Sequence, residues 1–506
     1  MSEYFIGVDS GTQSTKAIVI DGKNGKILGS ASSAYGFIEG LPAGAREQHP
    51  RVWVKAMEAA IKQALLAARV KAGAVKGIGV SGQQHGFVPL NEKGEVLRPA
   101  KLWCDTSTAA QADSLVNRLG GLERAVALTG NGIPAGFTAS KIAWLKQHEP
   151  QHFKNLHTVL LPHDYLNFHL TGNRRMEAGD ASGTGCLDIK TRNWSESVIN
   201  AIDPLLGDKL PAISPSSEPA GELKAEVAKR LGLAAGIVVA SGGGDNMMAA
   251  IGTGNTKLGV VTASLGTSGT IFAYSSRPVV DPQGEVAAFC DSTGAWLPLI
   301  CTMNVTVATE LFKAAWQWDN DRLTAAAAQI PAGADGLLLL PYFEGERTPN
   351  LPAASGVYCG FNARNFTAAH MARATLEGVA LGLNYGLDRL KDLGVRPKQI
   401  RVTGGGSKNP LWRQILADVF DAEVIGLATA EGAAYGAAIQ AKWNHATVNG
   451  ERVRIQQLTD EFVKTEAGTR ATPNRKHLKL YKHLQLCHNK LSVANAPVFA
   501  DLAALR

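Results

Sequence analysis

The sequence predicts an α/β protein made of two domains, and three observations support this fold class. The chain has 506 residues, which exceeds the size at which a single hydrophobic core usually stops growing. A strand–turn–strand pattern with Gly, Thr and Ser in its turn occurs near residue 10 and again near residue 265, which indicates a duplicated domain. In both halves, apolar strands alternate with helical patterns, as in layered α/β folds.

The elements follow this pattern in order. The first strands are predicted in YFIGV and KAIVI, with DGKNGKI as the hairpin into a third strand. A helix is predicted over 50–70, because its apolar residues recur at three- and four-residue spacing, and the strand VKGIGVSG follows it. LGVVTAS and TIFAY repeat the opening hairpin in the second half. We expect domains at 1–250 and 251–445, and a helical tail at 446–506.

Composition indicates which kinds of molecule the protein binds. The 51 basic and 44 acidic residues leave a net charge of +7, and they intermix without a basic block, which disfavours a nucleic-acid partner. The six cysteines are scattered without a CxxC pair, as expected of free thiols in a reducing compartment. No run of 18 apolar residues occurs, and the N-terminus does not resemble a signal peptide. We therefore expect a cytoplasmic protein with small-molecule substrates and no membrane partner; a homodimer is compatible with the sequence.

Three glycine turns at strand ends are candidates for phosphate binding: DSGTQSTK (9–16), SLGTSGT (264–270) and TGGGSKNP (403–410). Such turns present backbone N–H groups and short hydroxyl side chains to phosphate oxygens. The sequence lacks GxxxxGK[ST], which disfavours a P-loop kinase. A single Gly-Thr turn can also be a plain hairpin. The third turn can also be read as a dinucleotide site with Glu423 on the ribose, although Asn409 stands where that fingerprint needs its last glycine.

Two aspartates follow predicted strands. Asp9 ends the first strand just before the first Gly-Thr turn, where a carboxylate suits Mg²⁺, usually through water. Capping of the turn is the alternative for Asp9. Asp245 and Asn246 follow three glycines in SGGGDNM, and consecutive glycines let another group approach closely. A structural turn aspartate is the alternative for Asp245.

Polar side chains also end the strand GIGV. Gln84 and His85 in GQQHG combine an amide with an imidazole, which suits sugar hydroxyls, although a lone loop histidine is more often structural. His157, His163 and His169 lack the spacing of metal ligands, so we expect them on the surface of a strand and a helix rather than in a metal site.

Longer segments identify a family. GFTASKIAWLKQH (136–148) and GVYCGFNARNFTAAHMARATLE (356–377) match two signature segments of the FGGY carbohydrate kinases, and DSGTQSTK, GQQHG, GGGDN, SLGTSG, GERTP and TGGGS follow in that family's order. The chain therefore resembles this family over about residues 4–440, and within it the xylulokinases most. The resemblance implies two actin-like, ribonuclease-H-like domains with an active-site cleft between them.

The resemblance also implies a reaction, the ATP-dependent phosphorylation of D-xylulose to D-xylulose 5-phosphate. Asp245 would be the catalytic base, and Asp9 would help to hold Mg²⁺. The residues implied for the sugar are Gln84, His85, Asp105 and Asn246. Those implied for ATP are Gly11, Thr12, Lys16, Gly266, Thr267 and Ser268 at the phosphates, and Gly405, Gly406 and Asn409 at the adenosine.

The QHG segment argues for a ketopentose, because glycerol kinases place an Arg-Glu pair there. In LWCDTST, Cys104 and Ser107 stand where many xylulokinases have Asn and Arg, and Gln84 stands where many have Met. Ribulose or fuculose is the alternative substrate, and a nucleotide-switched actin-like binding module is the alternative of another class. Glu346 and Arg347 in GERTP have no assigned role.

Overall fold

A computed structural model describes residues 3–505, and the chain divides into two compact units. Unit 1 comprises Met1–Lys257, Tyr274–Pro298 and Glu431–Val463. Unit 2 comprises Leu258–Ala273, Leu299–Ala430 and Lys464–Arg506. Each unit contains a mixed β-sheet with helices, so the predicted α/β class with two domains is confirmed.

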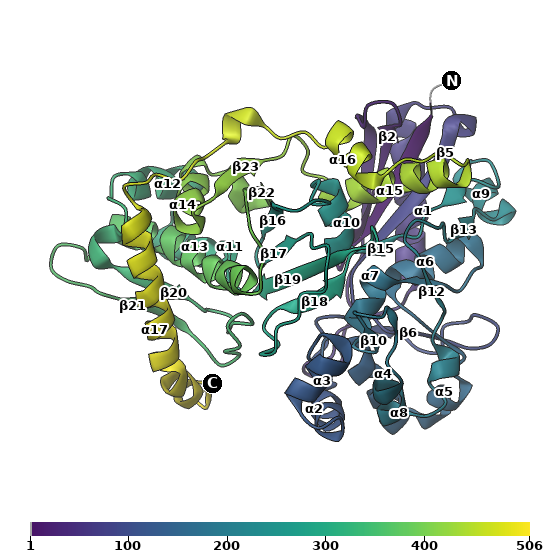
Figure 1. The fold of residues 1–506 in the computed structure, drawn as a ribbon, viewed down its shortest axis with the longest axis horizontal. Helices are drawn as coiled ribbons and strands as arrows, with labels where there is room; N and C mark the ends of the chain where they lie inside the picture. Colours follow the sequence, from purple (N-terminus) through teal and green to yellow (C-terminus); the bar gives the residue numbers. More distant parts are fainter. Residues whose placement is uncertain (1–2, 506) are drawn as a thin grey trace. The chain divides into compact units, whose positions relative to one another are not determined.

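The sheet of unit 1 contains the predicted opening hairpin (Figure 1). Its strands are, in spatial order, β13 (Gly221–Glu222), β14 (Val238–Val239), β5 (Val75–Gly82), β1 (Tyr4–Ser10), β2 (Ser14–Asp21) and β3 (Ile27–Ala34), and β15 (Gly243–Gly244) also pairs with β5. Strands β1, β2 and β3 are antiparallel neighbours, whereas β5 runs parallel to β1. The strands expected in YFIGV, KAIVI and VKGIGVSG are therefore confirmed.

Helices pack on this sheet. The predicted helix at 50–70 is α1 (Arg51–Ala68), whose buried face includes Trp53, Met57 and Ile61. Helix α15 (Gly432–Val448) also packs against β1 and β5 (Figure 1). A Cβ atom added at Gly7 would lie only 1.9 Å from the carbonyl oxygen of Ala434, which shows how closely helix and sheet approach. Glycine in these strands is thus a packing requirement.

The remaining elements of unit 1 surround this core. The helices are α2 (Ala109–Arg118), α3 (Leu122–Thr129), α4 (Thr138–His148), α5 (Pro150–Asn155), α6 (Pro162–Thr171), α7 (Ala178–Ala181), α8 (Glu196–Ile202), α9 (Ala225–Leu231), α10 (Asp245–Gly252) and α16 (Ile455–Phe462). The short strand pairs are β4 (Glu47–Gln48) with β7 (Ala100–Lys101), β6 (Val88–Leu90) with β8 (Thr158–Leu160), β9 (Met176–Glu177) with β12 (Ile213–Ser214), and β10 (Leu187–Asp188) with β11 (Asn193–Trp194). Strand β18 (Ala287–Cys290) lies in the second segment of this unit.

Unit 2 repeats the hairpin and surrounds it with longer helices. Its sheet runs β19 (Trp296–Thr302, which begins in unit 1), β17 (Gly269–Ala273), β16 (Val260–Leu265), β22 (Gln399–Thr403) and β23 (Glu423–Gly426), and β20 (Leu338–Pro341) pairs separately with β21 (Gly356–Cys359). The helices are α11 (Thr306–Trp316), α12 (Asn320–Ala328), α13 (Ala368–Asp392), α14 (Pro410–Phe420) and α17 (Leu478–Ala503). The predicted second hairpin is confirmed by β16 and β17, and the segment at 446–506 contains the long helix α17.

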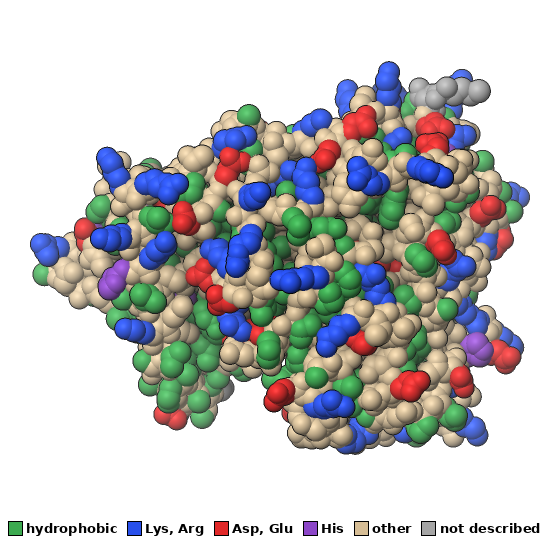
Figure 2. Space-filling view, viewed as in Figure 1, with side chains coloured by type: hydrophobic (Ala, Val, Ile, Leu, Met, Phe, Trp, Pro, Cys, Tyr) green, Lys and Arg blue, Asp and Glu red, His purple; other side chains and the backbone are tan. Residues whose placement is uncertain are grey.

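The surface carries both signs of charge. On the face shown in Figure 2, Lys and Arg side chains are interspersed with Asp and Glu rather than gathered in one block. Among residues 3–505, no helix has the length and apolar character needed to span a bilayer. All six cysteines are free thiols.

Candidate functional site

The sheet of unit 1 aligns the ends of four strands. Asp9 on β1 pairs with Lys16 on β2 and with Ser81 on β5, and Ser81 pairs in turn with Gly243 on β15. The predicted catalytic residue, Asp245, directly follows β15 and begins α10. Register alone therefore brings the aspartate expected to hold metal and the aspartate expected to act as base to the same edge of one sheet.

Tight packing of α10 against α15 fixes where Asp245 lies. A Cβ atom at Gly252 would lie 1.8 Å from the carbonyl oxygen of Gly432, and one at Gly436 would lie 1.8 Å from that of Met248. The two helices therefore approach each other at positions where no side chain can be accommodated. The N-terminus of α10 is held on a rigid support, as a catalytic side chain requires.

The three glycines before Asp245 allow neighbouring protein atoms to lie where side chains would otherwise be. A Cβ atom at Gly242 would lie 2.6 Å from the carbonyl oxygen of Val80, and the positive φ of 72° at this residue also favours glycine. A Cβ atom at Gly243 would lie 2.4 Å from Ser292 Oγ. The groups that approach these glycines so closely are thus neighbouring protein atoms.

Both hydrogen bonds to the carboxylate of Asp245 are accepted by the same oxygen. Oδ1 accepts hydrogen bonds from the backbone N–H of Asn246 at 2.7 Å and from its side-chain Nδ2 at 2.9 Å. Within residues 3–505, Oδ2 accepts none. Burial raises the pKa of Asp245 to about 7, and the charge of Asp9 acts in the same direction. A carboxyl with a pKa near neutrality and one unengaged oxygen can accept a proton from a hydroxyl group.

Asp9 has the features of a magnesium ligand. Its Oδ1 accepts a hydrogen bond from Ser81 Oγ at 2.9 Å, while its other oxygen accepts none in the described part of the chain. Burial raises the pKa of Asp9, and the nearby charge of Lys16 opposes that shift. Residues 3–505 contain no cluster of three or more metal-ligating side chains. One carboxylate fits Mg²⁺, which keeps several waters and shares phosphate oxygens, but does not fit a fully protein-ligated ion.

The first Gly-Thr turn is held by side chains of unit 1. The hydroxyl of Tyr35 donates to the carbonyl oxygen of Gly11 at 2.7 Å, and Gln48 donates to that of Thr12 at 2.7 Å. The Thr12 hydroxyl accepts from Trp103 Nε1 at 2.9 Å. Lys16 lies 2.8 Å from Glu431 in an ion pair. The phosphate-binding roles of Gly11, Thr12 and Lys16 remain predictions.

His85 is locked in an unusual backbone conformation. Its φ is +63°, and its carbonyl oxygen accepts hydrogen bonds from Lys141 Nζ at 2.7 Å and from the Thr138 hydroxyl at 3.2 Å. The ring stacks on Phe137 with 4.4 Å between centroids, and Nδ1 lies 2.6 Å from the carbonyl oxygen of Gly183, to which it must donate. The stacking and the contact with Gly183 together fix the orientation of the ring.

Lys141 is a functional candidate that the sequence-based assignment missed. It is fully buried on α4, and it also donates to the carbonyl oxygen of Gly136 at 2.6 Å. Burial lowers the pKa of Lys141 to about 7, and the charge of Asp105 opposes that shift. The available signal was a lysine between small and apolar residues in GFTASKIAW, where an amphipathic helix would bury its side chain.

Asp105 is fully buried, and its oxygens have internal partners. Ser107 donates to Oδ1 through its hydroxyl at 2.5 Å and its backbone N–H at 3.0 Å. The backbone N–H of Arg46 donates to Oδ2 at 2.8 Å, and Lys101 lies 3.3 Å from the same atom. Lys101 therefore supplies a cation beside Ser107. A role for Asp105 in sugar binding remains a prediction.

In unit 2, the second Gly-Thr turn is anchored by its carbonyl groups. The carbonyl oxygen of Gly266 accepts from the backbone N–H and the hydroxyl of Thr306, both at 2.9 Å, and that of Thr267 accepts from the N–H of Val305 at 3.0 Å. The side chains of Thr267 and Ser268 are exposed. An exposed turn whose carbonyls are already satisfied can present its N–H groups to an anion.

The third glycine turn lies beside the second, because β22 pairs with β16 in parallel. A Cβ atom at Gly404 would lie 3.1 Å from the backbone nitrogen of Gly266, so the two turns touch. Gly405 is exposed, with no other group near its Cα position. Asn409 caps α14 by accepting from the N–H of Trp412 at 3.2 Å. Nucleotide contacts by Gly405, Gly406 and Asn409 remain predictions.

Glu346, which had no assigned role, is a buried carboxylate within unit 2. It accepts hydrogen bonds from the Thr302 hydroxyl at 2.7 Å and from the backbone N–H of Met303 at 2.9 Å. These contacts hold the GERTP loop to the end of β19. Arg347 is exposed, and its backbone N–H donates to Glu346 at 2.7 Å.

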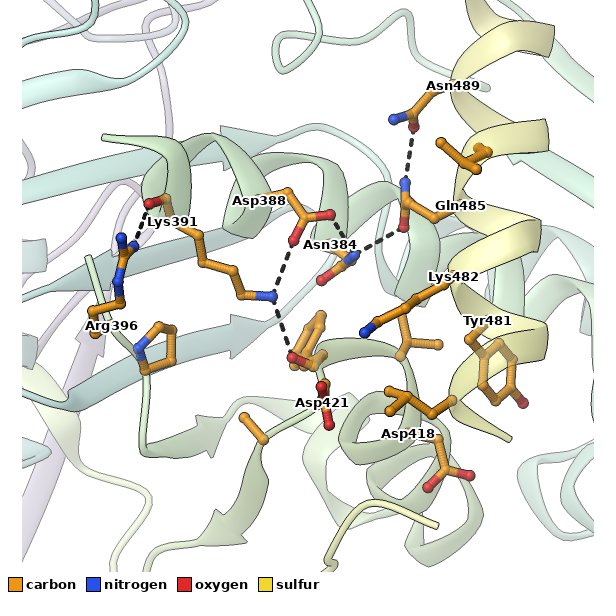
Figure 3. A pocket seen from close by; sticks show the side chains of 16 residues that line it. Asn384, Asp388, Lys391, Arg396, Asp418, Asp421, Tyr481, Lys482, Gln485 and Asn489 are labelled. Carbon is orange, nitrogen blue, oxygen red and sulfur yellow. Dashed lines mark hydrogen bonds and ion pairs between the residues drawn. The ribbon is translucent and has the colours of Figure 1, made fainter. Parts of the chain in front are cut away.

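A cavity of about 600 Å³ in unit 2 lies among α13, α14 and α17 (Figure 3). Lys391 forms an ion pair with Asp388 at 3.0 Å and donates to the carbonyl oxygen of Phe420. Gln485 bridges Asn384 and Asn489, at 3.0 and 2.8 Å. These polar contacts connect α17 to α13 and α13 to α14, which indicates that they help to hold the terminal helix in place.

The expectation that His163 lies on the surface is wrong. His163 is fully buried, with Nδ1 2.7 Å from Asp180 Oδ2 and Nε2 3.0 Å from Asp164 Oδ1. Its helix α6 packs against β5, so the histidine faces the sheet and is compensated there by two carboxylates. His157 is exposed and His169 is partly exposed, as predicted.

Comparison with known proteins identifies the family. The N-terminal and C-terminal domain models of the FGGY family of carbohydrate kinases match residues 4–252 and 261–445. A xylulose kinase from Haemophilus influenzae is 41% identical over 485 residues, covering 95% of this chain and 97% of that protein. A xylulose kinase from Bacillus subtilis is 33% identical, with 95% of each chain covered. The crystal structure of a xylulose kinase from Rhodospirillum rubrum has a TM-score of 0.89 and 29% identity, covering 98% of this chain and 100% of that chain. The chain belongs to the FGGY family of carbohydrate kinases.

Proposed function

We propose that this carbohydrate kinase transfers the γ-phosphoryl group of ATP to the terminal hydroxyl of D-xylulose, giving D-xylulose 5-phosphate and ADP. The observation that carries the chemistry is the carboxyl of Asp245, which has a pKa of about 7 and an unengaged Oδ2 among the described residues. The choice of sugar is supported by relatives that are xylulose kinases at 41% and 33% identity over nearly the whole chain.

In the proposed reaction, Asp245 Oδ2 accepts the proton of the sugar hydroxyl as that oxygen attacks the γ-phosphorus. The new O–P bond forms while the bond from the γ-phosphorus to the β–γ bridging oxygen breaks, and ADP leaves with that electron pair. Asn246 donates to Oδ1 and so turns the other oxygen toward the substrate. General-base assistance of this kind contributes roughly 10²- to 10⁴-fold in rate.

Sugar recognition is proposed to use His85, Gln84 and Asn246. Nε2 of His85 is proposed to contact a sugar hydroxyl, with the ring held through Nδ1 at the carbonyl oxygen of Gly183. The amide of Asn246 donates to Gln84 Oε1 at 3.0 Å, so these two side chains are already oriented before any ligand binds. Preorganised polar groups reduce the entropic cost of binding.

ATP is proposed to contact the Gly-Thr turns at Gly11–Thr12 and Gly266–Ser268, with the adenosine along the turn at Gly405–Gly406. Asp9 would hold Mg²⁺, which when bound neutralises charge on the phosphates. We assign the sugar and the base to the domain at 1–250 and most nucleotide contacts to the domain at 251–445. A kinase of this kind works where ATP and reduced thiols are plentiful, which favours the cytoplasm.

Coupled measurement of ADP release tests this proposal. The protein is assayed with ATP and Mg²⁺ against D-xylulose, L-xylulose, D- and L-ribulose, L-fuculose and glycerol, with a no-sugar control. The expected result is the highest kcat/KM on D-xylulose and little release without sugar. A maximum on ribulose or fuculose would overturn the choice of substrate. Release that does not depend on any sugar would instead favour a nucleotide-switched binding module.

A further inference from the structure

A buried group of charges lies behind the catalytic aspartate in unit 1. His163 stands between Asp164 and Asp180, and all three side chains are essentially inaccessible to solvent. Burial lowers the pKa of His163, but the two carboxylates outweigh it and raise the pKa well above its ordinary value. Both ring nitrogens thus lie beside carboxylate oxygens where water cannot reach them.

The position of Asp180 is also fixed through its backbone. Glu177 precedes α7 and accepts hydrogen bonds from the N–H groups of Gly179 at 2.8 Å and Asp180 at 2.6 Å. Ser216 and Ser292 donate to the same carboxylate at 3.0 and 3.1 Å. Because four donors hold Glu177, the short helix that carries Asp180 has little freedom to move.

One oxygen of Asp180 faces Gln84. Oδ2 is taken by His163, whereas Oδ1 is buried without a partner in the described part of the chain, and so is the donor atom Nε2 of Gln84. A Cβ atom at Gly244 would lie 2.9 Å from Asp180 Oδ1 and 2.7 Å from Gln84 Cγ, so both groups border the same point. Burial raises the pKa of Asp180, and the His163 ring and the Gln84 amide both oppose that shift.

The carboxylate of Asp180 determines which way the Gln84 amide points. A carboxylate accepts hydrogen bonds only, so it favours the amide NH₂ on its own side and leaves the amide oxygen on the other. That oxygen, Oε1, is the one that accepts from Asn246 Nδ2 at 3.0 Å, and the same nitrogen donates to Asp245 Oδ1 at 2.9 Å. Polar groups thus lead from His163 through Asp180 and Gln84 to the catalytic aspartate, although Asp180 and Gln84 are neighbours without a hydrogen bond between them.

We propose that Asp180 is a positioning residue of the kinase: it fixes the orientation of the Gln84 amide, which through Asn246 keeps Asp245 Oδ2 directed at the sugar hydroxyl. This inference rests on the proposed function of Asp245 and adds residues that neither touch substrate nor bind nucleotide. His163 contributes to this arrangement by holding Asp180 Oδ2 through Nδ1 at 2.7 Å.

The test compares Asp180→Asn with a matched control, Asp164→Asn. Both variants remove one carboxylate from His163, but only Asp180 borders Gln84. An asparagine at 180 can present its own NH₂ and so reverse the Gln84 amide, which breaks the hydrogen bond from Asn246. Misplacing a catalytic group by about 1 Å can cost on the order of 10²-fold. We expect kcat with D-xylulose to fall roughly 10- to 100-fold in Asp180→Asn, with KM for ATP unchanged and kcat of Asp164→Asn close to that of the wild type.

A double-mutant cycle with Gln84→Met separates positioning from general destabilisation. If Asp180 acts through Gln84, Asp180→Asn has little further effect on kcat in the Gln84→Met background. Fully multiplicative losses, or equal losses of kcat in Asp180→Asn and Asp164→Asn, would overturn the proposal. Thermal unfolding midpoints are measured for all variants.

Should Asp180→Asn be unfolded at the assay temperature, Gln84→Met alone removes the same link, and a wild-type kcat in that variant would overturn the proposal. Failure of the underlying function is distinguishable, since the wild type would then show no sugar-dependent ADP release at all.

Discussion

The pH dependence of the kinase should follow the ionisation of Asp245. Burial and the charge of Asp9 raise the pKa of this carboxyl to about 7, whereas an ordinary aspartate titrates near 3.8. Only the ionised form can accept the hydroxyl proton. At about pH 6, one unit below the pKa, roughly a tenth of the free enzyme carries the active carboxylate. We therefore expect kcat/KM for the sugar to rise about tenfold from pH 6 to the plateau above pH 8.

The assay is initial-rate ADP release over pH 5.5–9 with MgATP and the sugar both well below their KM values, since the rate then reports the ionisation of the free enzyme. Asp245→Asn keeps the shape of the side chain but removes the base, and it should lower kcat by roughly 10²- to 10⁴-fold on the plateau above pH 8. An acidic limb near pH 4, or a variant with nearly wild-type kcat, would refute the role given to Asp245.

Three other predictions concern the groups that support the site. Gly436→Ala should sharply lower the thermal unfolding midpoint, because its Cβ would collide with backbone of α10, whereas Gly73→Ala, which meets no atom within 4 Å, should not; equal midpoints would contradict the packing argument. Lys141→Met should raise KM for the sugar by releasing the His85 carbonyl, with little change in KM for ATP. Because the folded pKa of Lys141 is lowered to about 7, its contribution to stability is present at high pH and is lost as pH falls toward 7. The unfolding midpoint of the wild type relative to Lys141→Met should therefore increase from pH 7 to pH 9.5, and a constant difference would contradict the lowered pKa. Asp9→Asn should increase the Mg²⁺ concentration needed for half-maximal activity, and an unchanged requirement would remove Asp9 from the metal site.

Local patterns were sufficient to predict the fold. The opening hairpin, α1 and β5 follow from short apolar runs and from glycine turns, which depend on neighbouring residues only. The alignment of Asp9 with Ser81 also follows once β1 and β5 are paired in parallel. The discontinuous make-up of each unit, in which Glu431–Val463 belongs with the N-terminal segment, depends on contacts that no local pattern encodes.

The missed residues share one physical property, since each is a buried charge whose partners are distant in sequence. Lys141 reaches the carbonyl of His85, which lies 56 positions away, and His163 reaches Asp180, which lies 17 positions away. A polar residue in a helical pattern is ordinarily assigned to the solvent face, which is why His163 was expected at the surface. Compensation of the buried charge by neighbouring carboxylates can be seen only in three dimensions.

The identity of the product tests the central claim most directly. After incubation with D-xylulose, ATP and Mg²⁺, phosphorus NMR with proton correlation shows where the transferred phosphoryl group resides. The account predicts one phosphomonoester coupled to the C5 protons of the sugar, formed in equal amount to ADP and formed roughly 10²- to 10⁴-fold more slowly in Asp245→Asn. Inorganic phosphate as the only product, or an ester on another hydroxyl, would contradict it.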